Sequence, residues 1–488
     1  TRMVMLKDNY SFSMVTMGDT LSAESSFVNS FFNSFTPEEK KLGRNIYDNK
    51  LDEFFTDLFS KDSATQKKAQ QSITNLHYGE KGVPKIVAAI ERLNLSDAAY
   101  FDTKTRLVAE LGYIHDTTKP VVVGQLKKIF EQTADTSLFQ NEVFKALARH
   151  KTKASFSLFK ELILQEPPVF SDSYEYNSLF RNLADSLLLA KDLFPELLQL
   201  STLGDYKDNV LSLLVTLVDS GFIKAPDYQD YFTQIYFDAK VELKRQQVKD
   251  EKIMEKELLK EEDEKTSLFE NYGRYDKSNL DDYSVLLIPF YEKNKGVQLF
   301  FERLLRSREP EVRLTAAVLL LRNKLPVADS FLLNLAADDR YRSQLYTKLE
   351  KAKRLDKFPL KYKNQQDMAR SFLVADKNYN RIDSIVFIKT QPAAYLDKKG
   401  VVYYFKYRVK KEDDWKIGIS GLQPEDPKSI FADDKLTSMT DKKIKAGEPL
   451  DDQLQNQLKK ILFSFHKSGK DFYGYSGTYK AVTDYEED

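Results

Sequence analysis

Histidine is the first residue type to consider, because its imidazole acts as a general base or a metal ligand near neutral pH. The chain of 488 residues has four histidines, His77, His115, His150 and His466. None of them belongs to an HExxH motif or another closely spaced pair. The first three fall near predicted turns between helices, where a metal-binding or pH-sensitive strip along one ridge is one interpretation. Ordinary histidines at turns and helix ends are the interpretation that we favour.

Carboxylates are the second possible source of chemistry. Residues 376–380 (DKNYN) place side-chain oxygens at the first, third and fifth positions of a calcium loop. Arg381 replaces the required glycine, and Phe387 stands where a bidentate glutamate belongs, so we predict an ordinary polar turn. Acidic pairs occur at Asp413-Asp414, Glu425-Asp426, Asp433-Asp434 and Asp451-Asp452. Solvated turns and helix caps explain these pairs better than paired catalytic carboxylates do.

Nucleophiles and phosphate-binding loops complete the search for chemistry. Residues 474–477 (GYSG) approach a nucleophile elbow, but Thr478 stands where GxSxG requires its last glycine. Neither GxxxxGK[ST] nor GxGxxG occurs. The chain has no cysteine, which excludes thiolate catalysis and cysteine-based zinc sites. We therefore predict no catalytic residue, no cofactor and no metal ligand.

Charge and hydropathy limit the classes of partner. Lys and Arg number 74, and Asp and Glu also number 74, so the formal charge is zero and clustered phosphate binding has no bulk support. We predict no nucleic-acid partner, although the lysine-rich residues 348–363 leave that option open. The apolar run at 210–218 is too short to cross a bilayer, so we predict no membrane span. Hydrophobic residues make up 42%, which is enough to build cores.

The absence of cysteine also bears on compartment. It fits a bacterial extracytoplasmic protein of the periplasm or cell envelope, with the cytoplasm as the alternative. The chain begins at Thr1 without a charged segment followed by an apolar one. We expect that any signal peptide has been removed or lies upstream.

Helical periodicity dominates the chain, most clearly between Gly296 and Pro326. Two predicted helices meet there at Glu309-Pro310, because proline fits the first turn of a helix but not its interior. One face of the first helix is predicted to carry Leu299, Phe300, Arg303, Leu304 and Ser307. One stripe of the second is predicted to carry Val312, Ala316, Leu319 and Leu320.

An internal comparison extends this helix pair into a series. The RLxA pattern at 313–316 also occurs at 106–109, and a proline follows each copy after a similar interval, at Pro326 and Pro120. Second helices are predicted to begin at Pro84, Pro120, Pro195 and Pro226, and at Ser155 in the unit around 144–164. Residues 310–313 (PEVR) followed by Ala316 resemble the turn and second-helix opening of a HEAT-type repeat. The resemblance implies an irregular HEAT-like α-solenoid with units of about 30 to 40 residues, and an irregular helical bundle is the alternative.

The N-terminal residues 1–50 are predicted to form a β-hairpin followed by a helix. Strands at 4–6 and 10–17 flank a turn at 7–9, and Phe27, Phe31 and Phe35 form a stripe that must be buried. This order resembles the tail of a PsbP-like α+β domain, which implies that residues 1–50 end an upstream domain. The order of domain and repeats also resembles TraB/GumN-type fusion proteins, although none of that family's catalytic motifs occurs.

The remaining domains follow from changes in period. Residues 51–240 and 283–355 are predicted to be HEAT-like repeats, separated by a charged helix or linker at 241–282. The apolar positions of this linker, Val241, Val248, Ile253, Leu258 and Leu259, are sparse and poorly phased. A solvated helix or tether is therefore favoured over a coiled-coil partner site.

Residues 356–488 are predicted to form a small C-terminal α+β domain. Strands at 384–390, 401–409 and 415–421 would form an antiparallel meander. A helix containing Leu454, Leu458, Ile461, Leu462 and Phe465 would pack on one face of it and stop at Gly469.

The sequence thus predicts a mostly α protein with no visible chemistry of its own. We expect a monomeric, non-enzymatic scaffold that binds another protein or a peptide along the solenoid surface. The alternative is the accessory region of an enzyme whose catalytic part lies upstream or in the C-terminal α+β domain.

Overall fold

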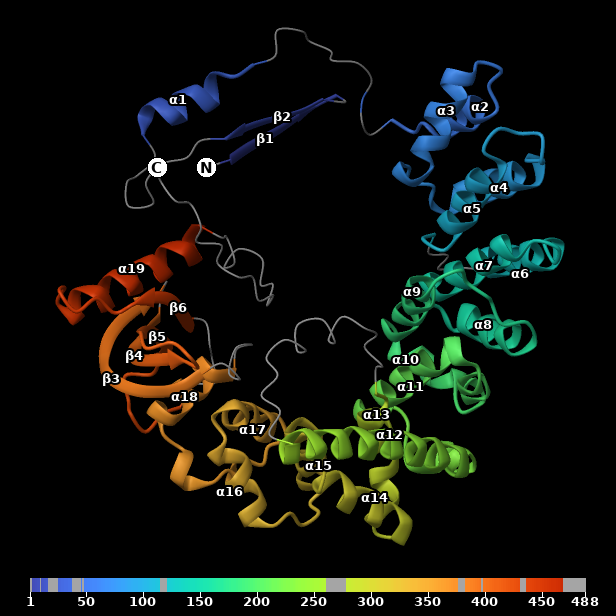
Figure 1. Ribbon diagram of the computed structural model, residues 1–488. Coiled ribbons are helices and arrows are strands. Elements are labelled where there is room, and N and C mark those ends of the chain that lie inside the picture. Colours follow the sequence, from blue (N-terminus) through green and yellow to red (C-terminus); the bar gives the residue numbers. More distant parts are fainter. Residues whose placement is uncertain are drawn as a thin grey trace. The chain divides into compact units, whose positions relative to one another are not determined.

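The computed structural model describes residues 2–8, 10–15, 25–36, 45, 48–114, 121–259, 278–375, 382–395, 398–430 and 436–467 (Figure 1). The chain divides into two compact units, Thr1–Leu213 and Leu214–Asp488. Helices dominate both units, with a hairpin near the N-terminus and an antiparallel sheet near the C-terminus. The prediction of a mostly α fold with a small α+β region is therefore confirmed, while the likeness to HEAT repeats stays a resemblance.

The N-terminal segment is the predicted hairpin and helix. Strand β1 (Arg2–Lys7) pairs antiparallel with β2 (Tyr10–Val15), and Ser25 caps α1 (Ser26–Ser34) by accepting from the Val28 amide at 3.2 Å. The expected burial of the phenylalanine stripe is wrong for the described residues. Phe27 and Phe31 are 75% and 55% exposed, because α1 turns Phe32 inward instead.

The helices of the first unit stack in two layers. They are α2 (Leu51–Leu58), α3 (Ser63–Ser72), η1 (Ile73–Asn75), α4 (Gly79–Arg92), α5 (Tyr100–Leu111), α6 (Val121–Gln132), α7 (Ser137–His150), α8 (Lys153–Gln165), α9 (Ser173–Ala184), α10 (Leu187–Ala190), η2 (Lys191–Leu193), η3 (Glu196–Thr202) and α11 (Gly204–Asp219), the last of which continues into the second unit. Helix α7 contacts α5 and α9 in its own layer and α6 and α8 in the other. Each apolar face is thus covered by the neighbouring helices.

Ion pairs connect successive elements of the layer that contains α4, α6 and α8, and the paired residues are separated by similar lengths of chain. Lys128 of α6 pairs with Glu91 of α4 at 2.8 Å, and Lys127 of α6 pairs with Glu161 of α8 at 2.9 Å. Lys160 of α8 in turn pairs with Glu196 of η3 at 2.8 Å. The partners lie 37, 34 and 36 residues apart. These separations agree with the interval of about 30 to 40 residues expected for the repeating unit.

The predicted helix starts are only partly correct. Pro84 lies inside α4 instead of opening it, because the helix begins at Gly79, whose φ of 59° only glycine adopts without strain. Ser155 does belong to a helix start, since its amide donates to Thr152 Oγ1 at 3.1 Å in the capping box of α8. Pro195 and Pro226 stand at the starts of 3₁₀ segments, and Pro120 lies outside the described residues.

The second unit also begins with packed helices. Its elements are η4 (Ala225–Tyr231), α12 (Phe232–Leu259), α13 (Leu280–Leu287), η6 (Ile288–Phe290), α14 (Lys295–Leu305), α15 (Pro310–Arg322), α16 (Asp329–Ala337), α17 (Asp339–Lys351), η7 (Leu355–Lys357), η8 (Leu360–Tyr362) and α18 (Gln365–Ala375). Leu314, Leu332 and Leu345 are each 0% exposed and lie in one core between α15, α16 and α17.

The stretch from Gly296 to Pro326 is the predicted helix pair. Pro310 is the first residue of α15, and Phe300 and Leu304 of α14 are buried as expected. Leu299, however, is 45% exposed. Helix α14 contacts both α12 and α15, so Val297 and Phe301 are buried on either side of Phe300 in place of Leu299.

The C-terminal domain is a four-stranded antiparallel meander. Its elements are β3 (Ile382–Tyr395), β4 (Lys398–Val409), β5 (Trp415–Gln423), β6 (Ser438–Lys443) and α19 (Leu450–Lys467), with strand order β3-β4-β5-β6. Leu454 and Leu458 of α19 pack on one face, as predicted. The other face is covered by α18, which the sequence pattern did not predict, through Leu373 against Phe405 (Figure 1).

Candidate interaction surface

Helix α12 has one face that packs inside the second unit. Ile235, Ala239 and Leu243 are 4%, 0% and 4% exposed, and the helix contacts α13 and α14. Glu242 and Gln246 lie on the same face and are also buried. The expectation of a solvated helix or tether is therefore wrong for this part of α12.

The apolar periodicity of the sequence did not reveal the inner face of α12, because polar residues interrupt that face. Glu242 and Gln246 occupy inner positions, whereas Val241 and Val248, which the sequence analysis counted as the apolar positions, lie on the outside. A signal was nevertheless present. Ala239, Leu243, Gln246 and Asp250 follow one another at the helical steps of four, three and four.

The polar inner residues of α12 hold the elbow between α14 and α15. One carboxylate oxygen of Asp250 accepts from Ser307 Oγ at 2.8 Å, from the Arg308 amide at 3.0 Å and from Gln246 Nε2 at 3.1 Å. Glu309 stands at the N-cap of α15 without a side-chain cap, and its amide donates to Ser307 Oγ at 3.2 Å. These hydrogen bonds of Asp250 therefore hold α12 against the elbow between α14 and α15.

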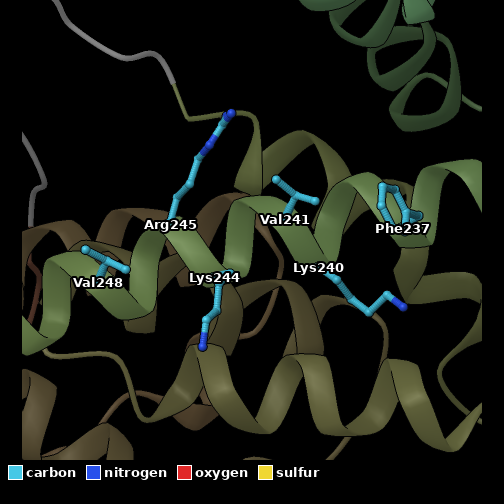
Figure 2. Close-up of a pocket in the computed structure, with 6 residues that line it drawn as sticks. All are labelled: Phe237, Lys240, Val241, Lys244, Arg245 and Val248. Atoms are coloured by element: carbon cyan, nitrogen blue, oxygen red, sulfur yellow. The ribbon is translucent and has the colours of Figure 1, made fainter.

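The outer face of α12 carries a hollow with an apolar floor. The hollow measures about 490 Å³ and is lined by Phe237, Lys240, Val241, Lys244, Arg245 and Val248 (Figure 2). Phe237, Val241 and Val248 are 60%, 39% and 44% exposed. Surfaces of monomeric proteins seldom expose contiguous apolar side chains without a functional reason.

Cations flank this apolar strip on both sides. Lys240 and Lys244 extend from one side of the helix and Arg245 from the other (Figure 2). Lys240 Nζ lies 4.9 Å from the centre of the Tyr236 ring, a cation–π contact that restrains it. Arg245 bonds buried Glu242 at 2.6 Å, yet its side chain remains 67% exposed. None of the six lining residues is acidic.

A second hollow lies at the start of α15. It measures about 80 Å³, and Pro310, Arg313, Asp338 and Tyr341 are among its lining residues. This volume holds no more than a few water molecules. Pro310 and Arg313 were predicted to lie at the turn and the opening of a second helix, and in the structure both belong to the first turn of α15, next to α16 and α17.

The sequence-derived histidine strip does not form a common surface. His77 is exposed, whereas His150 is 1% exposed and its Nδ1 lies 3.1 Å from Thr152 Oγ1. His115 and the side chain of His466 lie outside the described residues. Within the part of the chain that the structure describes, no group of three His, Asp or Glu side chains is arranged to hold a metal ion.

The carboxylate candidates are surface groups or lie outside the described residues. Asp414 pairs with Lys443 at 2.6 Å, and Lys389 donates to Asp451 at the start of α19. These contacts are those of solvated turns and caps. Residues 376–381, 433–434 and 474–478 are not among the described residues.

Buried polar groups of the C-terminal domain serve its own packing. Gln365 Nε2 donates to the carbonyls of Pro424 and Asp426 at 2.9 Å and of Ser429 at 2.7 Å. Its Oε1 accepts from Tyr403 Oη at 2.8 Å. The side chain is thus used fully in fixing the loop after β5.

Comparison with known proteins gives no relative for this chain. No protein family, no curated protein and no solved structure matches it. Among the described residues, no helix combines the length and the apolar character needed to cross a membrane. The hollow on α12 is therefore interpreted from its own chemistry.

Proposed function

We propose that the protein is a non-enzymatic scaffold that binds another protein through the outer face of α12. The observation that carries the proposal is the hollow of about 490 Å³, with three exposed apolar side chains as its floor and three cations around them. Apolar area surrounded by charged side chains is the usual composition of a protein-binding surface. The described lining side chains include no Ser, Thr, His, Asp or Glu.

The shape of the hollow favours a macromolecule over a small ligand. Small-molecule sites are concave cavities that enclose most of the ligand surface. The described lining residues all come from one helix, between Phe237 and Val248, so no facing element among the described residues closes the hollow. A bound partner would supply the opposite wall.

The inner face of α12 makes this surface rigid. Leu243 and Glu242 are buried next to outward-facing Val241 and Lys244, and the Asp250 hydrogen bonds fix the following turn to the elbow. A surface that is ordered before binding loses less conformational entropy when the partner binds.

Photo-crosslinking tests the proposal. A benzophenone amino acid replaces Phe237 in one variant and Leu333 in a matched control, since Leu333 is a 40% exposed apolar side chain on α16. We expect a discrete protein adduct from position 237 that is missing from position 333. The captured protein is then purified, and its affinity for the wild type is compared with that for V241E by calorimetry.

The two results together decide the proposal. We expect V241E to weaken binding of the purified partner by at least about tenfold, because the substitution places a charge in the apolar floor. Equal capture at 237 and 333, or equal affinity of V241E and the wild type, would overturn the assignment of this surface. Circular dichroism spectra of both variants confirm that the fold is retained.

A further inference from the structure

The spacing of the apolar floor indicates the shape of its partner. Phe237, Val241 and Val248 are separated by four and seven residues, the spacing of core positions in a helix–helix seam. Lys244 occupies the remaining core position between the two valines. A seam from Phe237 to Val248 spans about 16 Å, so a helix of about three turns would cover it.

The charges around the floor indicate the composition of that helix. Lys240 and Arg245 stand on either side of the apolar strip, in the flanking positions from which charged side chains select a partner helix, and Lys244 adds a third cation within the seam. The whole chain has a formal charge of zero, so the cluster is a local feature. Acidic side chains on both flanks of a partner's apolar stripe would complement it.

A second copy of this chain does not supply that complement. Along α12 beyond the hollow, Lys249, Lys252 and Lys256 balance Glu251, Glu255 and Glu257, and Asp250 is bound to the elbow between α14 and α15, so this part of α12 offers no free acidic excess to another copy. Pairing hollow to hollow would bring the cations of the two copies together. We therefore take the partner to be a different chain, and self-association of the full chain through this surface would overturn that choice.

A bilayer or a nucleic acid fits the surface less well. A helix that lies on a membrane buries a continuous apolar stripe, whereas Lys244 interrupts the strip between Val241 and Val248. A nucleic-acid backbone would satisfy the cations but would leave the apolar floor without a matching group. Only an amphipathic peptide matches both the floor and its flanks.

We infer that the outer face of α12 binds an acidic amphipathic helix of about three turns from another protein. The inference rests on the proposed function and specifies its partner class. Apolar side chains of the bound helix pack on Phe237, Val241 and Val248, and its carboxylates pair with Lys240, Lys244 and Arg245.

A designed peptide tests this partner class directly. The probe is a capped helical peptide of about 14 residues, with leucine at the core heptad positions and glutamate at the flanking ones. One control peptide has lysine in place of each glutamate, and the other has serine in place of each leucine. By fluorescence anisotropy, we expect the acidic amphipathic peptide to bind the full chain at least about tenfold more tightly than either control.

A charge reversal in the protein sharpens the test. The variant K240E/K244E leaves Arg245 and its bond to Glu242 in place, and should reverse the preference in favour of the lysine peptide. The matched control is K249E/K293E, which makes the same change of charge at two exposed lysines outside the hollow. This control should keep the wild-type preference.

The outcomes separate this inference from the proposed function. Equal binding of the acidic and lysine peptides, or a preference that K240E/K244E leaves unchanged, overturns the acidic-helix inference. Tighter binding to anionic vesicles or to a single-stranded oligonucleotide than to the acidic peptide overturns it as well. A crosslinked partner that depends on Val241 but lacks an acidic helix would leave the scaffold function standing and remove only this inference.

Discussion

Helices α7 and α12 each bury a glutamate, but they arrange its cations differently. Glu142 of α7 is 4% exposed and pairs with Lys145 at 3.0 Å and with Arg149, and those side chains are only 18% and 15% exposed. Glu242 of α12 is 5% exposed and pairs with Arg245, whose side chain is 67% exposed. The charges of α7 are used within the stack, whereas those of α12 face outward.

The difference follows from how many neighbours each helix has. Helix α7 contacts α5, α6, α8 and α9, and Lys145 also reaches Glu175 of α9 at 3.0 Å. Helix α12 contacts η4, α13 and α14 on its inner side, and its outer side carries the hollow. The same helix–helix architecture thus gives a structural charge network in one unit and an exposed face with apolar and cationic side chains in the other.

Neutralising the two glutamates should produce the largest contrast. We expect Glu142→Gln to lower the free energy of unfolding of the first unit by about 3 kcal/mol, because Arg149 and Lys145 lose a buried counter-ion. Glu242→Gln should cost about 1 kcal/mol or less, because water can solvate Arg245. Urea denaturation gives the size of each effect.

Hydrogen exchange locates these effects. Amide hydrogen exchange should accelerate in α5, α7 and α9 in the Glu142→Gln variant. In the Glu242→Gln variant, exchange in α12 should stay near the wild-type rate. Equal losses from the two substitutions would show that the contrast between the charge networks has no energetic meaning.

Two glycines test the same contrast through packing. A Cβ at Gly112, which ends α5, would lie 2.8 Å from the backbone Cα and carbonyl oxygen of Ala146 on α7, and neither atom can move alone. We expect Gly112→Ala to cost about 2 kcal/mol. A Cβ at Gly296 would meet the end of the Tyr236 ring, 3.0 Å from its Cζ, and this ring can shift. Gly296→Ala should therefore cost about 1 kcal/mol.

Removing the Tyr236 hydroxyl provides the control. The double variant Y236F/G296A should recover part of the loss measured by urea denaturation, because the hydroxyl is the atom closest to the added methyl group. No equivalent truncation exists at Gly112, where the obstacle is backbone. A larger loss at Gly296 than at Gly112 would contradict the distinction between the rigid and the yielding contact.

Much of the fold follows from sequence period alone. The hairpin at the N-terminus, the break at Pro310 and the three strands between Ile382 and Gln423 all carried local signals that the structure confirms. Helix α18 carried no such local signal, because its apolar residues pack in two directions. Met368 packs toward α17, and Leu373 packs toward the sheet. A single-face periodicity cannot describe a helix that is buried from two directions.

The candidate surface was harder to predict for a related physical reason. Val241 and Val248 looked poorly phased because the true inner face of α12 includes Glu242, which pairs with Arg245 of the same helix, and Gln246, which donates to Ser307 of the α14–α15 elbow. Sequence period counts these residues as outward-facing. The surface that we propose returns to the coiled-coil partner site that the sequence left as an alternative, and the exposed strip became recognisable only once both faces of α12 were known.

The smallest effect that we predict concerns Glu110, which lies beside the α7 network. Burial raises the pKa of this carboxyl above its ordinary 4.5, and the nearby charge of Arg149 opposes the shift. Because the folded state binds this proton more tightly than the unfolded state does, the stability that Glu110 contributes is complete below pH 4.5 and is lost as the pH rises through the raised pKa.

The substitution Glu110→Gln removes this loss of stability at higher pH. Urea midpoints measured between about pH 4 and about pH 8 should show the variant equal to the wild type at the acidic end and more stable at the neutral end. A variant less stable than the wild type at the neutral end would mean that the charge of Arg149 outweighs burial at this site, and that the α7 network already reaches across to α5.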